Sequence, residues 1–278
     1  MTALFALLSA ALIGGADFVG GHTSRRHPPL VVAVTAQLLG LAIGIPLALV
    51  WGWDAVSTRD VLFSVGSGVC VGLGFACFYT AMGRGTISLV VPIAAVTGAT
   101  IPVAVGIGGG DRPSALALVG IALALVAVGI VSLTSDADAT GNDASSTLLL
   151  ALGAGIAFGA FYVVFAEISE DSGVWPIPLQ RTGSVAVLVA LALLLRAPLS
   201  AGRQVARPAL AIAMLEVSAT VPLLLALQRG PLSVASVLAS LYPVTTVALA
   251  ALVLRERLSR PQLGGVGLAL VAVVLVST

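Results

Sequence analysis

The chain reads as a series of apolar runs separated by short links that hold polar residues, glycine or proline. Most runs approach the roughly 20 residues that a helix needs to cross the hydrocarbon core of a membrane. Backbone polar groups in lipid must be hydrogen-bonded within their own segment, so runs of this length predict helices. The pattern predicts an all-α membrane protein with ten transmembrane helices, at residues 2–21, 30–51, 61–83, 86–107, 113–133, 147–168, 174–195, 208–228, 231–254 and 261–277.

The two halves of the chain repeat at an offset of 145 residues, and each predicted half holds five spans. Because five is odd, the second half must enter the membrane in the opposite orientation. Inverted-topology repeats are a recurrent transporter architecture, in which the substrate site lies near the midplane between the halves. We therefore expect a first repeat at 1–134, an acidic linker at 135–146 and a second repeat at 147–278. The pairs related by this offset include Gly14 with Gly159, Ser88 with Ser233, and Gly120 with Gly265.

Composition supports a membrane protein and argues against several other classes. Of the 278 residues, 59% are hydrophobic and 9% charged, whereas a soluble domain carries about 25% charged residues. The net charge of +1 gives no reason to expect a nucleic-acid partner. No His, Cys, Asp and Glu cluster has metal-ligand spacing, and no motif of a soluble enzyme occurs. We expect neither a metal nor a cofactor, and no enzymatic activity.

Three segments carry a resemblance to a known family. They are LIGGADFVGGHTSRR in the first span, AMGRGTISLVVPIAAVTGATIPV across spans three and four, and the stretch from LQRGPLSVASVLASLYPV to the end of the tenth span. Together they resemble the EamA family of the drug/metabolite transporter superfamily. The resemblance implies a ten-helix carrier that works by alternating access. It leaves the substrate open, because the family carries amino acids, nucleobase-like metabolites, sugars and toxic organic compounds.

Two charged residues of the second half lie within predicted spans. A charge at a helix centre costs roughly 2.5–3.5 kcal/mol and should face the bundle interior or a water-filled cavity. Glu216, near the middle of span eight, is a candidate for binding a proton or a substrate amine; alternatively, it is a structural partner for an arginine. Arg181, in span seven, either extends to the interface, binds a substrate carboxylate or neutralises Glu216. A carboxylate and an arginine in one cavity would suit an amino acid.

The first half contributes one carboxylate, Asp17, about three-quarters along span one. It shares a helix face with Gly14 and Gly21, and small residues there favour close helix packing. The residue at the equivalent position of the second repeat is Tyr162, which also has a polar tip. We expect two pseudo-symmetric cavity positions; the alternative is an interfacial carboxylate that pairs with Arg25.

Uncharged polar residues form a stripe in span nine. Ser233, Ser236 and Ser240 follow helical spacing, with Tyr242 and Pro243 just beyond. The proline frees a backbone carbonyl, which predicts a ligand contact or a hinge. The alternative for each serine is helix–helix packing.

Weaker candidates lie in other spans. Pro92 and Thr97 in span four are a rough counterpart of the stripe, and Pro222 interrupts span eight as a third candidate hinge. Tyr79 in span three could point inward.

The arginines give an orientation that conflicts with the resemblance. Basic residues concentrate in cytoplasmic loops. The links on the side of both termini hold Arg59, Arg112 and Arg229. The opposite links hold Arg25, Arg26, Arg84, Arg196, Arg203, Arg207, Arg255, Arg257 and Arg260. This count favours external termini, whereas the resemblance implies cytoplasmic ones.

The sequence thus predicts a secondary transporter that exports small amino-acid-like or amphipathic compounds across the cytoplasmic (inner) membrane. No nucleotide-binding segment occurs, so a proton gradient is the natural energy source, with Glu216 and Asp17 as candidate coupling residues. A monomer suffices because two halves complete one antiparallel pair, although a dimer is an alternative. The alternative functions are an intramembrane enzyme acting on a lipid-linked substrate, and a channel or scaffold.

Overall fold

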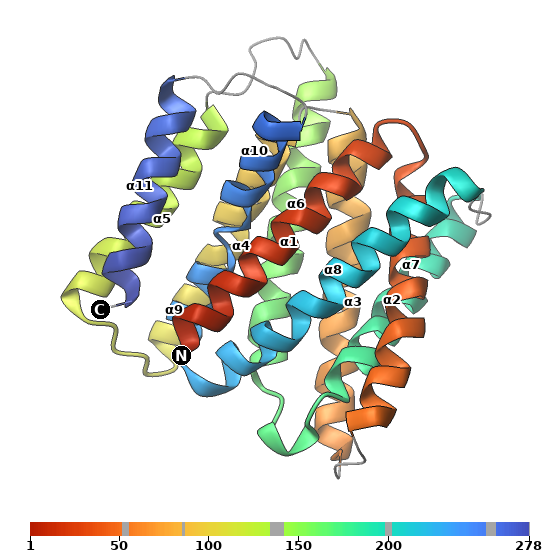
Figure 1. Ribbon diagram of the computed structural model, residues 1–278, viewed down its shortest axis with the longest axis horizontal. Helices are drawn as coiled ribbons and strands as arrows, with labels where there is room; N and C mark the ends of the chain where they lie inside the picture. Colours follow the sequence, from red (N-terminus) through yellow and green to blue (C-terminus); the bar gives the residue numbers. More distant parts are fainter. Residues whose placement is uncertain (52–55, 85–86, 134–141, 198–201, 254–259, 278) are drawn as a thin grey trace.

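The structure is a computed structural model that describes residues 1–51, 56–84, 87–133, 142–197, 202–253 and 260–277. These residues form a bundle of helices that lie side by side, and no strand occurs among them (Figure 1). The α-helices are α1 (Thr2–Ser24), α2 (Pro29–Trp51), α3 (Thr58–Arg84), α4 (Ile87–Gly108), α5 (Ala115–Leu133), α6 (Asn142–Ala166), α7 (Pro176–Leu194), α8 (Arg203–Arg229), α9 (Leu232–Ala239), α10 (Tyr242–Val253) and α11 (Arg260–Ser277). A short 3-10 helix, Glu170–Ser172, connects α6 to α7. The predicted linker at 135–146 lies mostly outside the described residues.

Six of the described helices, α1, α2, α3, α6, α7 and α8, are long and apolar enough to cross a membrane. Large apolar side chains on their outer faces, such as Leu4, Leu62 and Leu149, are 63%, 68% and 70% exposed. A surface of this kind is costly in water and suits lipid, because apolar groups there lose nothing by exposure. The protein is therefore a multi-pass membrane protein.

The ninth predicted span is not one continuous helix. The structure has α9 and α10 in its place, with Ser240 and Leu241 between them. Pro243 supplies the reason, because it has no backbone N–H and its ring collides with the carbonyl of Ala239, four residues earlier. The expected interruption at Pro222 is wrong, since α8 runs without a break from Arg203 to Arg229.

The first five helices, α1 to α5, pack mainly against helices of the second half. The helix α1 packs on α8, α2 on α7, α3 on α6 and α5 on α11, while α4 packs on α6 and α1 on α9 and α10. Glycines allow two of these close crossings. A Cβ on Gly14 would lie 2.6 Å from Thr245 Cβ of α10, and one on Gly159 would lie 2.9 Å from Gly98 O of α4. The two glycines that the sequence paired thus occupy equivalent crossings.

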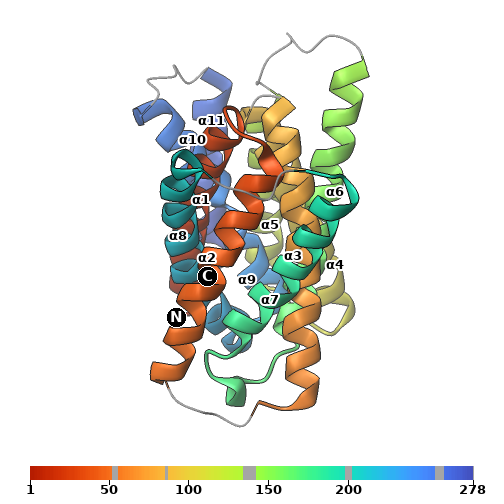
Figure 2. The ribbon, with the colours of Figure 1, turned by 90° about the vertical axis from the view of Figure 1, so that its right-hand side faces the viewer.

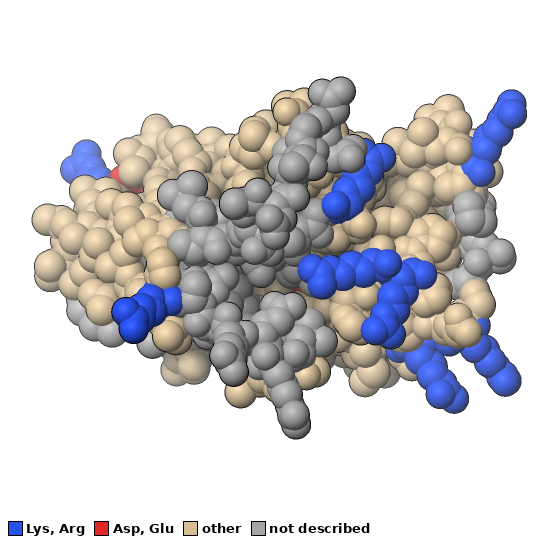
Figure 3. Space-filling model, turned by 90° about the horizontal axis from the view of Figure 1, so that it is seen from above, with Lys and Arg blue, Asp and Glu red and all other residues tan. Residues whose placement is uncertain are grey.

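The two ends of the bundle differ in charge. Both chain termini, the start of α3 and the link between α6 and α7 lie toward the lower end in Figures 1 and 2, which we call the chain-end face. Seen from the opposite end, arginine side chains gather over one part of the surface (Figure 3). We call this the arginine-rich face; its exposed arginines are Arg25, Arg26, Arg84, Arg196, Arg203, Arg207 and Arg260.

Candidate functional site

A cavity lies between the two halves of the bundle, lined by residues of α1, α3, α4, α6, α7, α8 and α10 and by the break before α10. Its volume is about 90 Å³, several times the ~10–15 Å³ that a single water requires. The space is therefore large enough for a small molecule or for several waters. The lining residues are Ile13, Asp17, Val71, Phe75, Ala94, Ala95, Gly98, Phe158, Phe161, Tyr162, Gln180, Arg181, Glu216, Ala219, Thr220, Leu223, Ser240 and Tyr242.

The lining follows the sequence repeat. Ten of the lining residues form five pairs that are separated by the repeat offset of 145 residues. Such an arrangement follows if corresponding helices of the two halves meet the cavity at the same depth. The pairs are Ile13 with Phe158, Asp17 with Tyr162, Val71 with Glu216, Phe75 with Thr220, and Ala95 with Ser240.

One side of the cavity holds a buried cluster of three polar side chains. The Nη1 atom of Arg181 on α7 donates to the carboxylate of Glu216 on α8 and also to Gln37 Oε1 of α2, at 2.7 Å. Gln37 Nε2 donates to Glu216 Oε2 at 2.8 Å, which closes the triangle. All three residues are buried, with exposures of 2%, 6% and 1% for Arg181, Glu216 and Gln37. The positive and negative charges therefore neutralise each other inside the bundle.

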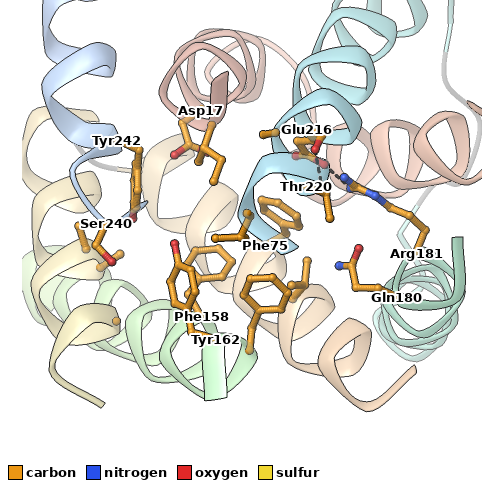
Figure 4. A pocket seen from close by; sticks show the side chains of 18 residues that line it. Asp17, Phe75, Phe158, Tyr162, Gln180, Arg181, Glu216, Thr220, Ser240 and Tyr242 are labelled. Carbon is orange, nitrogen blue, oxygen red and sulfur yellow. Dashed lines mark hydrogen bonds and ion pairs between the residues drawn. The ribbon is translucent and has the colours of Figure 1, made fainter. Parts of the chain in front are cut away.

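The other side of the cavity holds Asp17, which is 4% exposed. No hydrogen bond or ion pair joins its carboxylate to another residue in the described part of the chain. Tyr162, Tyr242 and Ser240 lie around it on the same side of the cavity, and the rings of Phe75 and Phe158 lie between this side and Glu216 (Figure 4). The Asp17 carboxylate is therefore the one cavity charge for which the described residues provide no opposite charge.

The remaining predicted site residues lie outside the lining. Tyr79 is buried behind Phe75, with ring centroids 5.3 Å apart, and its hydroxyl lies against Gly20 of α1. Thr97 faces Gly155 of α6 rather than the cavity. Tyr79 does point into the bundle, but neither side chain lines the cavity, because each fills the space over a glycine of a neighbouring helix.

The candidate hinges differ in what surrounds them. Pro222 is buried within α8, and Pro243 lies in the first turn of α10. Pro92 belongs to α4, but its side chain lies outside the described residues.

Sequence reasoning did not select the aromatic wall of the cavity. Phe75, Phe158 and Phe161 carry no charge or polar group, so hydropathy does not separate them from lipid-facing residues. Two signals were available: Phe158 lies one helical turn before Tyr162, and Phe75 is the repeat counterpart of Thr220.

The fold defines a multi-pass helical membrane protein with a mainly apolar cavity that includes three charged side chains, and comparisons with known proteins give the family of its second half. The model of the EamA-like transporter family matches residues 145–278. These residues therefore belong to that family, within the drug/metabolite transporter superfamily. Family members are small-molecule transporters rather than enzymes. The resemblance stated from the sequence is therefore confirmed.

Two further comparisons were with solved structures and with curated proteins. A solved crystal structure is similar to this chain with a TM-score of 0.76 and 15% sequence identity, and the match covers 99% of this chain and 95% of the other. At this identity the likeness establishes the shared fold alone. A search of the curated proteins gave no match to the sequence.

Proposed function

We propose that the protein is a secondary transporter that exports small amino-acid-like or amphipathic amines by alternating access. The observation that carries the proposal is the cavity between the halves, which contains one carboxylate, Asp17, without a partner among the described residues. The cavity is the substrate site, and Asp17 binds the amine.

The architecture that supports alternating access is a pair of inverted five-helix repeats. If the halves are related by a pseudo-twofold axis, each contact between helices of different halves should have a counterpart with the halves exchanged. The α1–α8 contact corresponds to α3–α6, and the contact of α4 with α6 corresponds to that of α1 with α9 and α10. The α2–α7 and α5–α11 contacts are their own counterparts. The broken α9–α10 segment also suits this class, because discontinuous helices frequently form transporter substrate sites.

The charges of the cavity favour an amine over a carboxylate as the group that is bound. Arg181 is bonded to Glu216 and Gln37, and its Nε lies next to Gly40 of α2, where an added Cβ would be 3.3 Å away. Asp17 remains as an unneutralised carboxylate, which attracts a cation in a site of low dielectric constant. Phenylalanine and tyrosine rings nearby bind apolar groups and stabilise cations through their electron-rich faces. The cavity charges therefore favour an amphipathic amine as substrate over an amino-acid zwitterion bound by Glu216 and Arg181.

The same carboxylate supports coupling to protons and gives the transport a direction. A carboxylate that holds either a proton or an amine exchanges one for the other. A proton gradient directed into the cell then drives the amine out of it. We accordingly assign proton coupling to Asp17 and a structural role to Glu216.

The surface charges support an orientation in the cytoplasmic membrane. The arginine-rich face carries seven exposed arginines, whereas the acidic residues Asp60, Asp111, Glu167, Glu170 and Asp171 belong to segments near the chain-end face. Since basic loops remain in the cytoplasm, we propose that the arginine-rich face is cytoplasmic. A reporter fused to the C-terminus tests this: it should be active outside, and cytoplasmic activity would contradict the orientation.

The test of function is ligand-induced thermal stabilisation of the purified protein with a panel of amino acids, aromatic amines and quaternary ammonium compounds at pH 6 and pH 8. Asp17→Asn is compared with Glu170→Gln, which removes an exposed carboxylate remote from the cavity. An amine should stabilise the parent and the Glu170→Gln variant, more strongly at pH 8 because protons compete for Asp17, and should not stabilise Asp17→Asn. Equal stabilisation of all three proteins at both pH values would remove Asp17 from the site.

A further inference from the structure

A buried polar cluster joins the two halves at the chain-end face. Asp60, in the first turn of α3 and 2% exposed, belongs to the first half. Its carboxylate accepts hydrogen bonds from Ser169 N at 3.1 Å, Ser169 Oγ at 2.7 Å and Ser172 Oγ at 2.9 Å, all from the second half. Ser57 of its own half donates a fourth, at 2.8 Å. We call Asp60, Ser169 and Ser172 the Asp60 cluster.

Neighbouring contacts hold the same two segments. Arg59 donates to Glu167 Oε2 at 2.7 Å and to Glu167 O at 2.8 Å, and its guanidinium lies 4.7 Å from the centre of the Phe63 ring. This pair is half-exposed and contributes little by itself. Gln228 of α8 donates to Ser169 O at 3.0 Å, which fixes the second-half side of the cluster. Figure 2 places the start of α3 and the α6–α7 link at the same end of the bundle.

The repeat offset identifies the equivalent place on the arginine-rich face, and the residues described there form no such cluster. The residue equivalent to Asp60 is Val205, an apolar side chain at the start of α8. Ser24, the counterpart of Ser169, has a buried hydroxyl without a hydrogen-bond partner in the described part of the chain. His27 replaces Ser172. Between these segments lies a hollow of about 420 Å³, lined by His27, Pro28, Val31 and the four residues 202–205.

We propose that the Asp60 cluster is the gate that holds the chain-end face of the transporter closed, and that the arginine-rich face opens more readily because it lacks the equivalent carboxylate. The inference rests on the proposed alternating access, in which contacts between the halves must separate on one face at a time. Hydrogen bonds to a charged carboxylate are stronger than neutral ones. The cluster lies at a helix end near the membrane surface, where water can replace these bonds when the face opens.

Thiol labelling tests the gate without any substrate. Val71→Cys, in the cavity lining, is the reporter in a Cys70→Ala, Cys77→Ala background. A membrane-impermeant reagent is added to vesicles sealed with either face outward. Removing one hydrogen bond to a charged group shifts the opening equilibrium by about tenfold.

Two variants remove contacts between the halves, and a third variant is the matched control. Ser172→Ala should accelerate labelling from the chain-end face by about tenfold, and Asp60→Val, which removes all three bonds between the halves, should accelerate it by more than tenfold. Ser57→Ala removes a bond to the same carboxylate within the first half, so its labelling rate should equal that of the parent. Labelling of Ser172→Ala and Asp60→Val no faster than that of Ser57→Ala would overturn the proposal.

A converse variant gives a second test that does not depend on the folding of Asp60→Val. Val205→Asp introduces a carboxylate at the position equivalent to Asp60, beside the hollow that Val205 lines together with His27, so labelling from the arginine-rich face should slow several-fold. Val205→Leu is the apolar control. Unchanged labelling in Val205→Asp would contradict the gate. If no amine binds to any variant while the labelling rates change as expected, the proposed substrate class fails and the gate stands.

Discussion

Separating Arg181 from Glu216 should destabilise the protein strongly, and removing both should not. Each single substitution leaves a buried group without its counter-charge, which costs about 3–5 kcal/mol. Arg181→Met exposes the Glu216 carboxylate to an apolar site, with Gln37 Nε2 as its remaining donor. Glu216→Gln leaves the guanidinium with Gln37 Oε1 as its neutral acceptor. Since each single variant keeps one hydrogen bond to Gln37, we expect costs near the lower end of that range.

A double-mutant cycle measures the coupling. The proteins are the parent, Arg181→Met, Glu216→Gln and the combination, each unfolded by denaturant in mild detergent. The double variant should be more stable than either single one, which requires an interaction free energy larger than about 3 kcal/mol. Single costs below about 1 kcal/mol that simply add would refute the reasoning, because they would mean that water screens the pair. Retention of amine binding in the double variant would assign the pair to stability rather than to the substrate.

Three further outcomes follow from the packing and the cavity. Gly14→Ala should cost about 1–3 kcal/mol in thermal unfolding, because its Cβ would lie 2.5 Å from a backbone oxygen of α10; Gly267→Ala, with open space around the Cβ, should cost nothing, and equal effects would contradict the close crossing. Pro243→Ala should slow transport in reconstituted vesicles at unchanged or higher stability, since it restores the helix through the break; faster transport would speak against a role for the broken helix. Phe158→Leu should weaken binding of an aromatic amine about fivefold, from the ~0.5–1.5 kcal/mol of ring interactions, while an aliphatic amine keeps its affinity; equal losses for both would exclude ring stacking.

The charged residues of the cavity could be found from the sequence alone. Asp17, Arg181 and Glu216 stood out in the sequence because a charge within an apolar run is costly, and this cost does not depend on the fold. The repeat then related Asp17 to Tyr162, and both line the cavity. Tyr79 is buried inside the bundle but lies outside the cavity lining, because a tyrosine is compatible with either a cavity or a helix contact, and periodicity does not distinguish them.

The burial of Asp60 at the chain-end face, by contrast, could not be found from the sequence. Asp60 ends a polar link in the sequence, where a solvated carboxylate is ordinary. Its burial depends on the link between α6 and α7, more than 100 residues later, which brings Ser169 and Ser172 onto it. No local pattern contains that information.

By itself, the sequence determined that this is a membrane protein, where its principal helices run and which charges must be buried. These properties depend on hydropathy, chain length and residue spacing, which are local. Only the tertiary structure decided that Gln37, Arg181 and Glu216 form one cluster and that Asp17 is left without a partner among the described residues. It also decided that the Asp60 cluster has no counterpart at Val205. The reason is physical: such contacts join residues far apart in sequence, and their geometry is fixed by how helices of the two halves pack against each other.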